Sequence, residues 1–367
     1  MAKRLAIAFL GICPLSSSFS ISPLTRRSLS NLPPLYMSLE AVASEARAKG
    51  LFRSTPLIRS MPLSKLVGKD VYLKLDALQA SGSFKDRGMA HLCYTLQQEG
   101  VATKLVSSSG GNAGLAVATI GQQLEMTVSV IVPETTKPLV VAKLKALGAE
   151  VTIHGENWNA ADQLARQRVE ENPTSVYISP YDNPLLWTGH SSLIDELAEE
   201  LTSVGALVVS VGGGGLLCGA LEGLKRRGLY QTAVIAAETE GAASFGQSWE
   251  KGALVTLSAI TSVATSLGAL QVTPVAIERA KQHQAGGGVF DSAICTDAEA
   301  VDACFQFAQD HRLLVEPACG AALAVAYSAR LRKKYLEGVQ GSIVLEVCGG
   351  SGVTIDLLTQ WKTEHLE

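Results

Sequence analysis

The chain has 367 residues, of which 47% are hydrophobic and 18% are charged, and its formal net charge is -3. This length allows two domains with a sizeable core, and the composition argues against disorder outside the chain ends. Because 31 basic residues balance 34 acidic ones without a long basic run, the sequence excludes the charge pattern of a nucleic-acid-binding protein.

The first 39 residues differ from the rest of the chain. They contain four basic residues and no acidic one, and an apolar run, LAIAFLGICPL, precedes the serine-rich stretch SSSFSISPLTRRSLS. This composition predicts a targeting segment, disordered or cleaved, for the mitochondrion or another organelle. A signal peptide has a similar apolar run, and a start at Met37 would leave a cytoplasmic protein. No apolar run reaches the ~20 residues that span a bilayer, so we expect no membrane association.

Short β-branched runs alternate with helical patterns from residue 71 onward. Strands are predicted at 71–75, 104–108, 127–133 and 150–155, with helices from Lys85, at 113–123 and at 139–147 between them. A second series has strands at 206–211, 233–240 and 342–347 and a helix at 216–228, while 246–255 and 283–292 are expected to be loops. Such repeated βαβ units predict an α/β fold with two open, mostly parallel sheets.

The stretch QASGSFKDRGMAH, residues 79–91, places one lysine at a predicted helix start. Ser83 is expected to cap the N–H of Asp86, and apolar residues then recur at helical spacing at Met89, Leu92, Cys93 and Leu96. Lys85 therefore lies in the first helical turn, where the helix dipole disfavours its charge. A solvated lysine near a helix start is the alternative.

Two glycine-containing loops follow strands and precede helices, where open α/β sheets bind ligands. The first is SSSGGNAG, residues 107–114, whose free N–H groups suit a carboxylate or phosphate, as do the hydroxyls of Ser108 and Ser109. Asn112 adds a side-chain amide to this loop. A tight turn without a ligand is the alternative. Four glycines precede Leu216 and indicate close approach of an anion to the helix N-terminus.

The tetraglycine stretch matches neither known nucleotide motif. No Lys-Ser or Lys-Thr follows it, and the G-x-G-x-x-G spacing fails. Glu238 nevertheless ends the next predicted strand, where a Rossmann fold binds ribose, so an NAD-dependent oxidoreductase is an alternative from another class.

The last predicted strand ends in CGGSG, residues 348–352. The seven cysteines of the chain show no C-x-x-C spacing, which indicates a reducing compartment and no structural zinc. Cys348 is therefore either a small buried residue or a weak hydrogen-bonding partner for a ring nitrogen. Together these features predict one ligand, with an aldehyde for the lysine, a phosphate for the glycine loop and an aromatic ring that the protein holds at its edges. Pyridoxal phosphate has all three groups.

The segments SGSFKDRG, SSGGNAG, SVGGGGLLCG, AAETEGAASF, VEPACGAALA and VCGGSG occur in this order. In this combination the chain resembles the fold type II pyridoxal-phosphate enzymes (tryptophan synthase beta-like), and most closely the L-serine dehydratase / L-threonine deaminase group, in its serine dehydratase-like branch. The resemblance covers roughly residues 46–362. It implies two open, mostly parallel-sheet domains with the active site between them, the larger from residues 46–78 and 184–367 and the smaller from 79–183.

The resemblance implies a role for each matching residue. Lys85 would form the Schiff base with the cofactor and act as the base for the α-proton, and Phe84 would pack on the pyridine ring. Asn112 would bind the ring hydroxyl, and Ser109 the substrate carboxylate. The phosphate would be bound by backbone N–H groups of Gly212, Gly213, Gly214, Gly215 and Leu216. Cys348 would face the pyridine nitrogen, and a monovalent-cation site, with potassium as a candidate ion, would include Glu238, Ala242 and Ser244.

The reaction implied is β-elimination, which converts L-serine to pyruvate and L-threonine to 2-oxobutyrate, each with ammonia, in a homodimer acting on small amino acids. A serine racemase and a β-replacement enzyme of the cysteine synthase type are alternatives within the same chemistry. Four residues depart from the pattern of the family. Gly110 replaces an alanine and is expected to enlarge the carboxylate site, Ser266 replaces another alanine, and Asp86 and Glu346 stand where apolar residues are expected. We expect Asp86 to raise the pKa of Lys85 unless it points into solvent.

Overall fold

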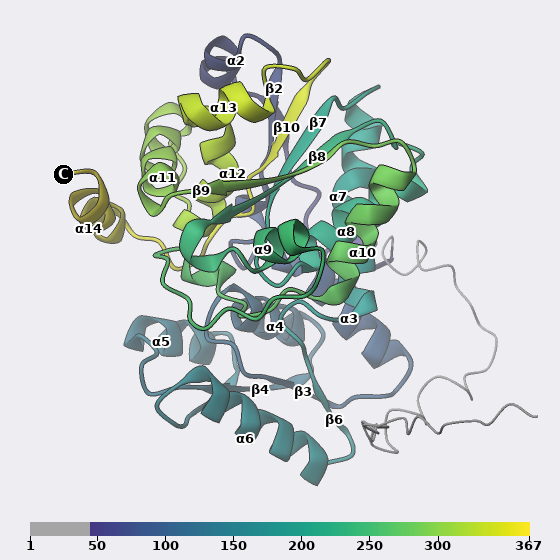
Figure 1. Cartoon of the computed structure of the whole chain (residues 1–367). Helices are drawn as coiled ribbons and strands as arrows, with labels where there is room; N and C mark the ends of the chain where they lie inside the picture. The colour runs from purple at the N-terminus through teal and green to yellow at the C-terminus, as the bar shows by residue number, and fades with distance from the viewer. Residues whose placement is uncertain (1–44) are drawn as a thin grey trace, which may run out of the picture. The chain divides into compact units, whose positions relative to one another are not determined.

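Two separate sheets organise residues 45–367, the part of the chain that this computed structural model describes (Figure 1). The larger sheet has the strand order β1-β2-β10-β7-β8-β9 and the smaller has β5-β4-β3-β6. Within these sheets the β1–β2 pair is antiparallel and the other pairs are parallel. The predicted α/β fold with mostly parallel sheets is therefore confirmed.

The strands have the following bounds. The larger sheet contains β1 (Leu57–Arg59), β2 (Val71–Lys74), β7 (Ala206–Ser210), β8 (Ala233–Thr239), β9 (Phe290–Cys295) and β10 (Ile343–Glu346). The smaller sheet contains β3 (Lys104–Ser107), β4 (Thr127–Val132), β5 (Glu150–Ile153) and β6 (Ser175–Tyr177). All strands of the smaller sheet fall within the predicted range 79–183, although the exact domain boundaries stay a prediction.

Helices cover both sheets. Those near the smaller sheet are α3 (Lys85–Gln98), α4 (Asn112–Gln123), α5 (Pro138–Ala146) and α6 (Trp158–Glu171). Those near the larger sheet are α2 (Met61–Val67), α7 (Pro184–Glu200), α8 (Gly215–Arg226), α9 (Ser244–Lys251), α10 (Pro274–Ala285), α11 (Asp297–His311), α12 (Pro317–Tyr327), α13 (Ala329–Tyr335) and α14 (Ile355–Leu366). Single 3₁₀ turns occur at η1 (Asp76–Leu78), η2 (Glu240–Ala242) and η3 (Thr265–Leu267).

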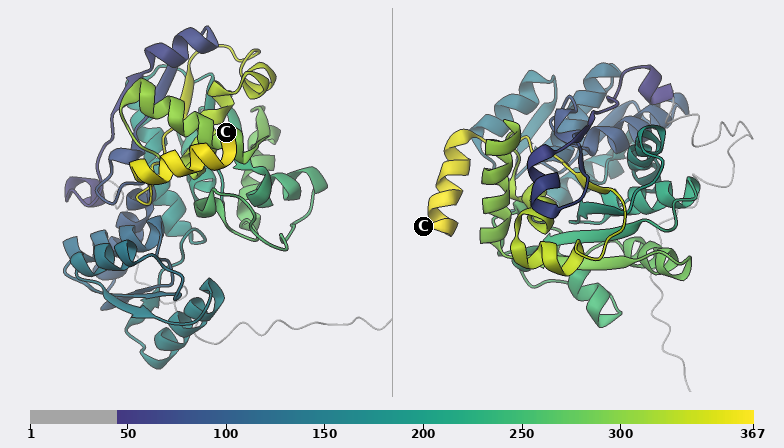
Figure 2. Two further views of the ribbon diagram at one scale, coloured as in Figure 1. Left: turned by 90° about the vertical axis from the view of Figure 1, so that its left-hand side faces the viewer. Right: turned by 90° about the horizontal axis from the view of Figure 1, so that it is seen from above.

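The core of the larger sheet explains its apolar sequence. Every residue of β7 is buried, as expected for a parallel strand covered on both faces. Every residue of α12 is also buried, because this helix packs between β7, β8 and α11. The terminal helix α14 packs on the other side of α11, as Figure 2 shows from two directions.

The structure contradicts two of the predicted loops. The range 246–255 contains most of α9, and 283–292 contains the end of α10 and the start of β9. Phe245 and Trp249 lie one helical turn apart and both pack on Phe290 of β9, with ring centroids 5.6 and 4.9 Å away. This long-range packing stabilises α9, and its glycine-flanked sequence gives no local sign of it.

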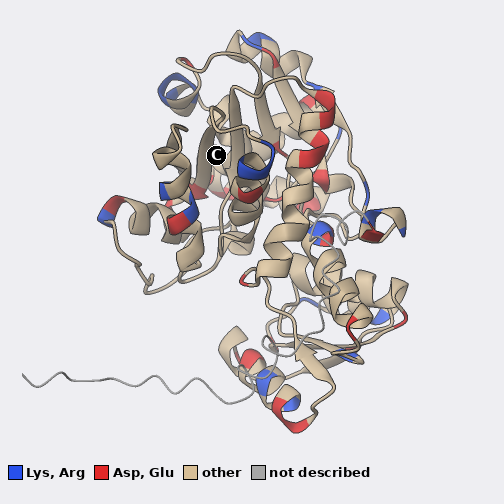
Figure 3. Ribbon diagram, turned by 90° about the vertical axis from the view of Figure 1, so that its right-hand side faces the viewer, with Lys and Arg blue, Asp and Glu red and all other residues tan. Residues whose placement is uncertain are grey.

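The predicted targeting segment, residues 1–39, and Met37 lie outside the described residues, so that prediction is untested. Among residues 45–367, no helix combines the length and the apolar character needed to cross a membrane. Basic and acidic residues are mixed in both the upper and the lower part of Figure 3.

Candidate active site

Lys85 is the first residue of α3, and its ammonium group donates a 2.5 Å hydrogen bond to the carbonyl oxygen of Pro180. The nitrogen lies 4.9 Å from the centroid of the Phe84 ring. Burial lowers the pKa of Lys85 to about 8, against a smaller opposing effect of Cys348. The amine is therefore close to losing its proton at neutral pH, which a nucleophile or a general base requires.

The loop before Lys85 is joined to the CGGSG loop by backbone contacts. The Phe84 N–H donates to the Cys348 carbonyl oxygen at 3.0 Å, and the Gly350 N–H donates to the Gly82 carbonyl oxygen at 3.0 Å. Ser83 and Gly349 form an isolated β-bridge between these two bonds. A Cβ on Gly349 would lie 2.3 Å from the Gly82 oxygen, so this close approach requires glycine.

The predicted cap of α3 by the Ser83 side chain is wrong. The Asp86 N–H instead donates to the backbone carbonyl oxygen of Ser83 at 3.3 Å, and the Ser83 hydroxyl is buried without a hydrogen-bond partner in the described structure. The reason is local geometry: Phe84, the residue before α3, already has a helical conformation, whereas a capping side chain needs an extended residue there.

Cys348 lies directly opposite this lysine loop and is a buried thiol. A hydrogen bond with Cys319, and then burial, raise the pKa of Cys348 well above its ordinary value. The sulfur therefore keeps its proton at any physiological pH.

His190 lies behind Phe84 on α7. The two rings are 5.0 Å apart and tilted, and both ring nitrogens of His190 are buried without a hydrogen-bond partner in the described structure. Burial, followed by the nearby charge of Lys85, lowers the pKa of His190 well below its ordinary value. The imidazole is therefore neutral.

The tetraglycine loop, Gly212 to Gly215, leads into α8. Gly214 adopts a left-handed conformation with φ 92°, and no side chain caps the N-terminus of the helix. A Cβ on Gly213 would lie 2.1 Å from the Tyr181 ring. Since Pro180, next to Tyr181, accepts the bond from Lys85, the segment 180–181 brings the lysine and this loop together. The uncapped N–H groups of α8, which include those at Gly215 and Leu216, suit an anion.

Asn112, the first residue of α4, connects the smaller sheet to the larger one. Its side-chain nitrogen donates to Glu316 Oε1 at 2.6 Å, and its oxygen accepts from the Ser351 hydroxyl and N–H at 2.6 and 3.0 Å. The structure thus brings the asparagine loop and the CGGSG loop together. The contact of Asn112 with a cofactor hydroxyl stays a prediction.

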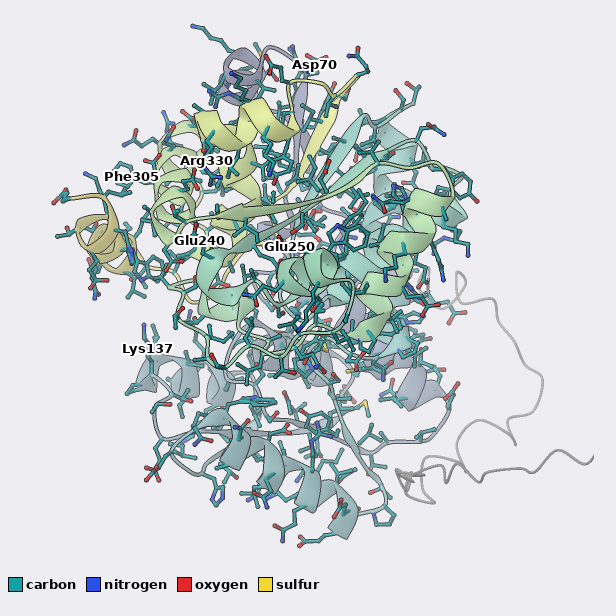
Figure 4. All side chains as sticks on the ribbon, in the orientation of Figure 1. Asp70, Lys137, Glu240, Glu250, Phe305 and Arg330 are labelled. Carbon is teal, nitrogen blue, oxygen red and sulfur yellow. The ribbon has the colours of Figure 1, made fainter. Side chains whose placement is uncertain are left out.

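A cavity of about 200 Å³ lies at this junction, lined among others by Gly110, Asn112, Lys137, Ser266, Glu316 and Ser351. In Figure 4, Lys137, the residue directly before α5, is labelled below the segment that carries Glu240. Sequence reasoning gave Glu316 no role, although it precedes the proline of VEPACGAALA. Burial raises the pKa of Glu316, against hydrogen bonds to Ser266 and Asn112. An acidic residue at the start of an otherwise apolar helix was the available signal.

Ser109 is partly buried at the start of the asparagine loop, and its hydroxyl accepts the Gly111 N–H at 3.3 Å. The expectation that Ser108 also faces an anion is wrong, because its hydroxyl lies 2.7 Å from Asp162 Oδ1 on α6. The expected enlargement of the carboxylate site by Gly110 stays a prediction. Gly110 lines the cavity, and a Cβ there would lie 3.1 Å from Val132 Cγ1 and 3.2 Å from Thr136 Cγ2.

A buried network of charges lies behind α3. Arg87 donates to both carboxyl oxygens of Asp76 and both of Glu196 at 2.7 to 2.8 Å, and Lys74 lies 2.6 Å from Glu196. Although burial alone would raise the pKa of Asp76, the Arg87 charge lowers it below its ordinary value. Two cations thus balance two anions.

The two unexpected acids add to this balanced network. Glu346 is fully buried on β10, and burial together with the Asp76 charge raises its pKa well above the ordinary value. Asp86 is also fully buried, accepts the Ser81 N–H at 2.9 Å, and has its pKa raised by burial to about 6. Asp86 therefore does not point into solvent, and Lys85 nevertheless keeps a lowered pKa.

The predicted cation-site residues lie together at the end of β8. Glu238 accepts the N–H groups of Phe245 and Gly246 at 2.9 and 2.6 Å, and burial raises its pKa to about 8 against these two bonds. Ala242 and Ser244 are buried nearby, in η2 and at the start of α9. Within residues 45–367 no group of three His, Cys, Asp or Glu residues could hold a metal ion.

A larger cavity of about 520 Å³ lies elsewhere. It is lined by residues at the amino ends of β7, β8 and β9, among them Gly205, Ala233 and Val289, and by none of the predicted site residues. Ligands in open α/β sheets bind at the opposite, carboxyl ends of the strands. We therefore place the site at Lys85.

These residues fit pyridoxal phosphate. Lys85 offers an amine of lowered pKa for the aldehyde, and the uncapped N-terminus of α8 offers N–H groups for the phosphate. Cys348 offers a neutral thiol for the ring nitrogen. Backbone bonds or packing connect all three positions to one another.

The comparisons with known proteins agree with this fit. A mouse protein named L-serine dehydratase/L-threonine deaminase is 44% identical over 324 residues, which cover 87% of this chain and 97% of the relative. A rat protein named serine dehydratase-like is 43% identical, over 89% of this chain and 99% of the relative, so identity does not separate these two groups. The crystal structure of a fungal L-serine ammonia-lyase from Rhizomucor miehei is similar with a TM-score of 0.80 and 33% identity, over 86% of this chain and 99% of that one. The sequence pattern described as "Pyridoxal-phosphate dependent enzyme" matches residues 49–349, and the chain belongs to this family.

Proposed function

We propose that this chain is an L-serine ammonia-lyase that converts L-serine to pyruvate and ammonia, with L-threonine to 2-oxobutyrate as a second activity. The observation that carries the proposal is the position of Lys85, whose pKa is about 8, between a neutral thiol and an uncapped helix N-terminus. The names of the mouse and fungal relatives support the choice of substrate.

Pyridoxal phosphate, when bound, supplies an electron-withdrawing ring that acidifies the α-hydrogen of an attached amino acid. The Lys85 amine accepts that proton in its neutral form, which its lowered pKa makes available. Ser109 and the adjacent N–H groups orient the substrate carboxylate. The bond between the β-carbon and the hydroxyl would then break, and the hydroxyl would leave as water together with one proton, equivalent to the proton that Lys85 removed from the α-carbon. One water molecule would then hydrolyse the carbon–nitrogen bond, which releases ammonia and leaves the 2-oxo acid.

The neutral Cys348 thiol supports elimination over transamination. A thiol that keeps its proton does not maintain a positive charge on the ring nitrogen, whereas an ionised carboxylate would. The negative charge that develops at the α-carbon would then be less strongly delocalised into the ring, so loss of the β-hydroxyl would be favoured.

We also propose that Glu238, Ala242 and Ser244 contribute to a site for a monovalent cation such as potassium. The buried hydroxyl of Ser244, which has no hydrogen-bond partner in the described structure, supports this proposal. Turnover in potassium buffer compared with turnover in tetramethylammonium buffer tests this proposal.

A homodimer is proposed as the active form, and sedimentation equilibrium of the full chain tests that proposal. Import directed by residues 1–39 is tested by the location of a fluorescent fusion.

The substrate is tested on the full-length protein with added pyridoxal phosphate. L-Serine and L-threonine are added separately, and the 2-oxo acid, ammonia and D-serine are all measured. Pyruvate and ammonia in equal amounts support the proposal. D-Serine without pyruvate would instead identify a racemase, and turnover only with an added thiol would identify a β-replacement enzyme.

A further inference from the structure

A partly buried cluster joins three elements around the smaller sheet at the start of the asparagine loop. Asp162 on α6 is 9% exposed, and its Oδ1 accepts the Ser108 hydroxyl at 2.7 Å and the Tyr177 hydroxyl at 2.5 Å. Its Oδ2 accepts Arg166 Nε at 2.7 Å, and the guanidinium of Arg166 lies 4.3 Å from the centre of the Tyr177 ring. The cluster thus connects α6, β6 and the loop that follows β3.

The Asp162 carboxyl is ionised in this cluster. Although burial alone would raise its pKa, hydrogen bonds from Tyr177, Ser108 and Arg166 lower it below the ordinary value. Hydrogen bonds to a charged group are stronger than those between neutral groups. The Ser108 hydroxyl is therefore held by Asp162, and Ser108 is not among the residues that line the cavity.

Ser108 is one peptide unit from Ser109, the residue predicted to bind the substrate carboxylate. Because Ser108 and Ser109 share one planar peptide unit, with Cα atoms about 3.8 Å apart, fixing Ser108 restricts the position of Ser109. The turn that follows is tight, because a Cβ on Gly114 would lie 1.7 Å from the Ser109 carbonyl oxygen. The loop is thus held at one end by Asp162 and at the other by α4.

We propose that Asp162 is a positioning residue for the substrate-carboxylate loop: by holding the Ser108 hydroxyl, it fixes Ser109 and the neighbouring N–H groups. The inference rests on the proposed function for the identity of the substrate. The anchoring of the loop does not depend on that function, so the two are tested separately.

Anchoring is tested by hydrogen–deuterium exchange of the full chain without substrate. Asp162→Asn is expected to raise the exchange rate about fivefold in the peptide that covers residues 107–114, the size of one lost hydrogen bond of about 1 kcal/mol. Glu171→Gln, on the exposed face of the same helix, is the matched control and is expected to leave this peptide unchanged. Unchanged exchange in Asp162→Asn, or an increase spread over the whole smaller sheet, would overturn the proposal.

The consequence for the substrate is tested by kinetics of the same variants. Asp162→Asn and Ser108→Ala are each expected to raise KM for L-serine about fivefold with kcat changed less than about twofold, because uniform substrate binding is lost. The double variant is expected to resemble either single variant. Independent, multiplying effects would overturn the proposal. If Asp162→Asn does not fold, Ser108→Ala alone serves for both the exchange and the kinetic experiment. Absence of pyruvate in the wild type would refute the proposed function, and the exchange experiment would still decide whether Asp162 anchors the loop.

Discussion

Asp86 gives the chain a stability that depends on pH. Its ordinary pKa is 3.8, whereas burial raises the folded value to about 6. Between these two values the folded state holds the proton while the unfolded state releases it, so stability falls as pH rises through this window. Above it the ionised carboxylate costs about 3 kcal/mol, the equivalent of about two pH units.

The substitution Asp86→Asn isolates this cost. Asparagine resembles the protonated carboxyl in shape, retains an oxygen to accept the Ser81 N–H, and does not titrate. The effect of the substitution on packing is independent of pH. The variant is therefore expected to gain stability over the wild type as pH rises.

Urea unfolding of the full-length protein at pH 5, 6, 7 and 8 measures the difference. The advantage of Asp86→Asn is expected to grow by roughly 1.5 kcal/mol from pH 5 to pH 8. Glu99→Gln, at the exposed position directly after the same helix, is the control, and its pH dependence is the reference for that of Asp86→Asn. A pH dependence of Asp86→Asn no larger than this reference would refute the assignment of a raised pKa to this carboxyl.

Three further substitutions test separate parts of the account. Gly110→Ala is expected to lower the free energy of unfolding by about 1 kcal/mol in urea, because its Cβ would crowd Val132 and Thr136. Pairing it with Thr136→Ser should recover part of this loss, and no loss would contradict this close packing around Gly110. Cys348→Ala is expected to retain the cofactor, seen by its visible absorption, but to slow pyruvate formation, and an unchanged rate would remove the role of the thiol. Glu346→Gln is expected to change the free energy of unfolding at pH 7 by less than about 1 kcal/mol, because the buried carboxyl is already uncharged. A larger loss of stability would indicate that Glu346 forms an ion pair.

Local sequence patterns were sufficient to predict the framework of the fold. β7 has a continuous apolar run because it is buried on both faces, and α8 follows directly from a glycine stretch that a helix start can use. In α9, by contrast, Phe245 and Trp249 are stabilised by Phe290, about 40 residues away in the sequence, so the short window around them was misread as a loop.

The loops of the site could be predicted for a similar reason, while the partners of individual side chains could not. Lys85 and Cys348 stand out because each follows or precedes glycines at a strand or helix end. The direction of the Ser108 hydroxyl depends on Asp162, which lies on a different helix. Glu316 was missed because its bond to Asn112 joins positions more than 200 residues apart.

The central claim is that Lys85 carries the reaction, and the variant Lys85→Ala tests it most directly. Full-length wild type and variant are each incubated with pyridoxal phosphate and L-serine, and pyruvate and the visible absorption of bound cofactor are followed together. We predict that the wild type forms pyruvate and that the variant loses both turnover and the absorption of cofactor bound through the lysine. Pyruvate formation at the wild-type rate by Lys85→Ala would contradict the account.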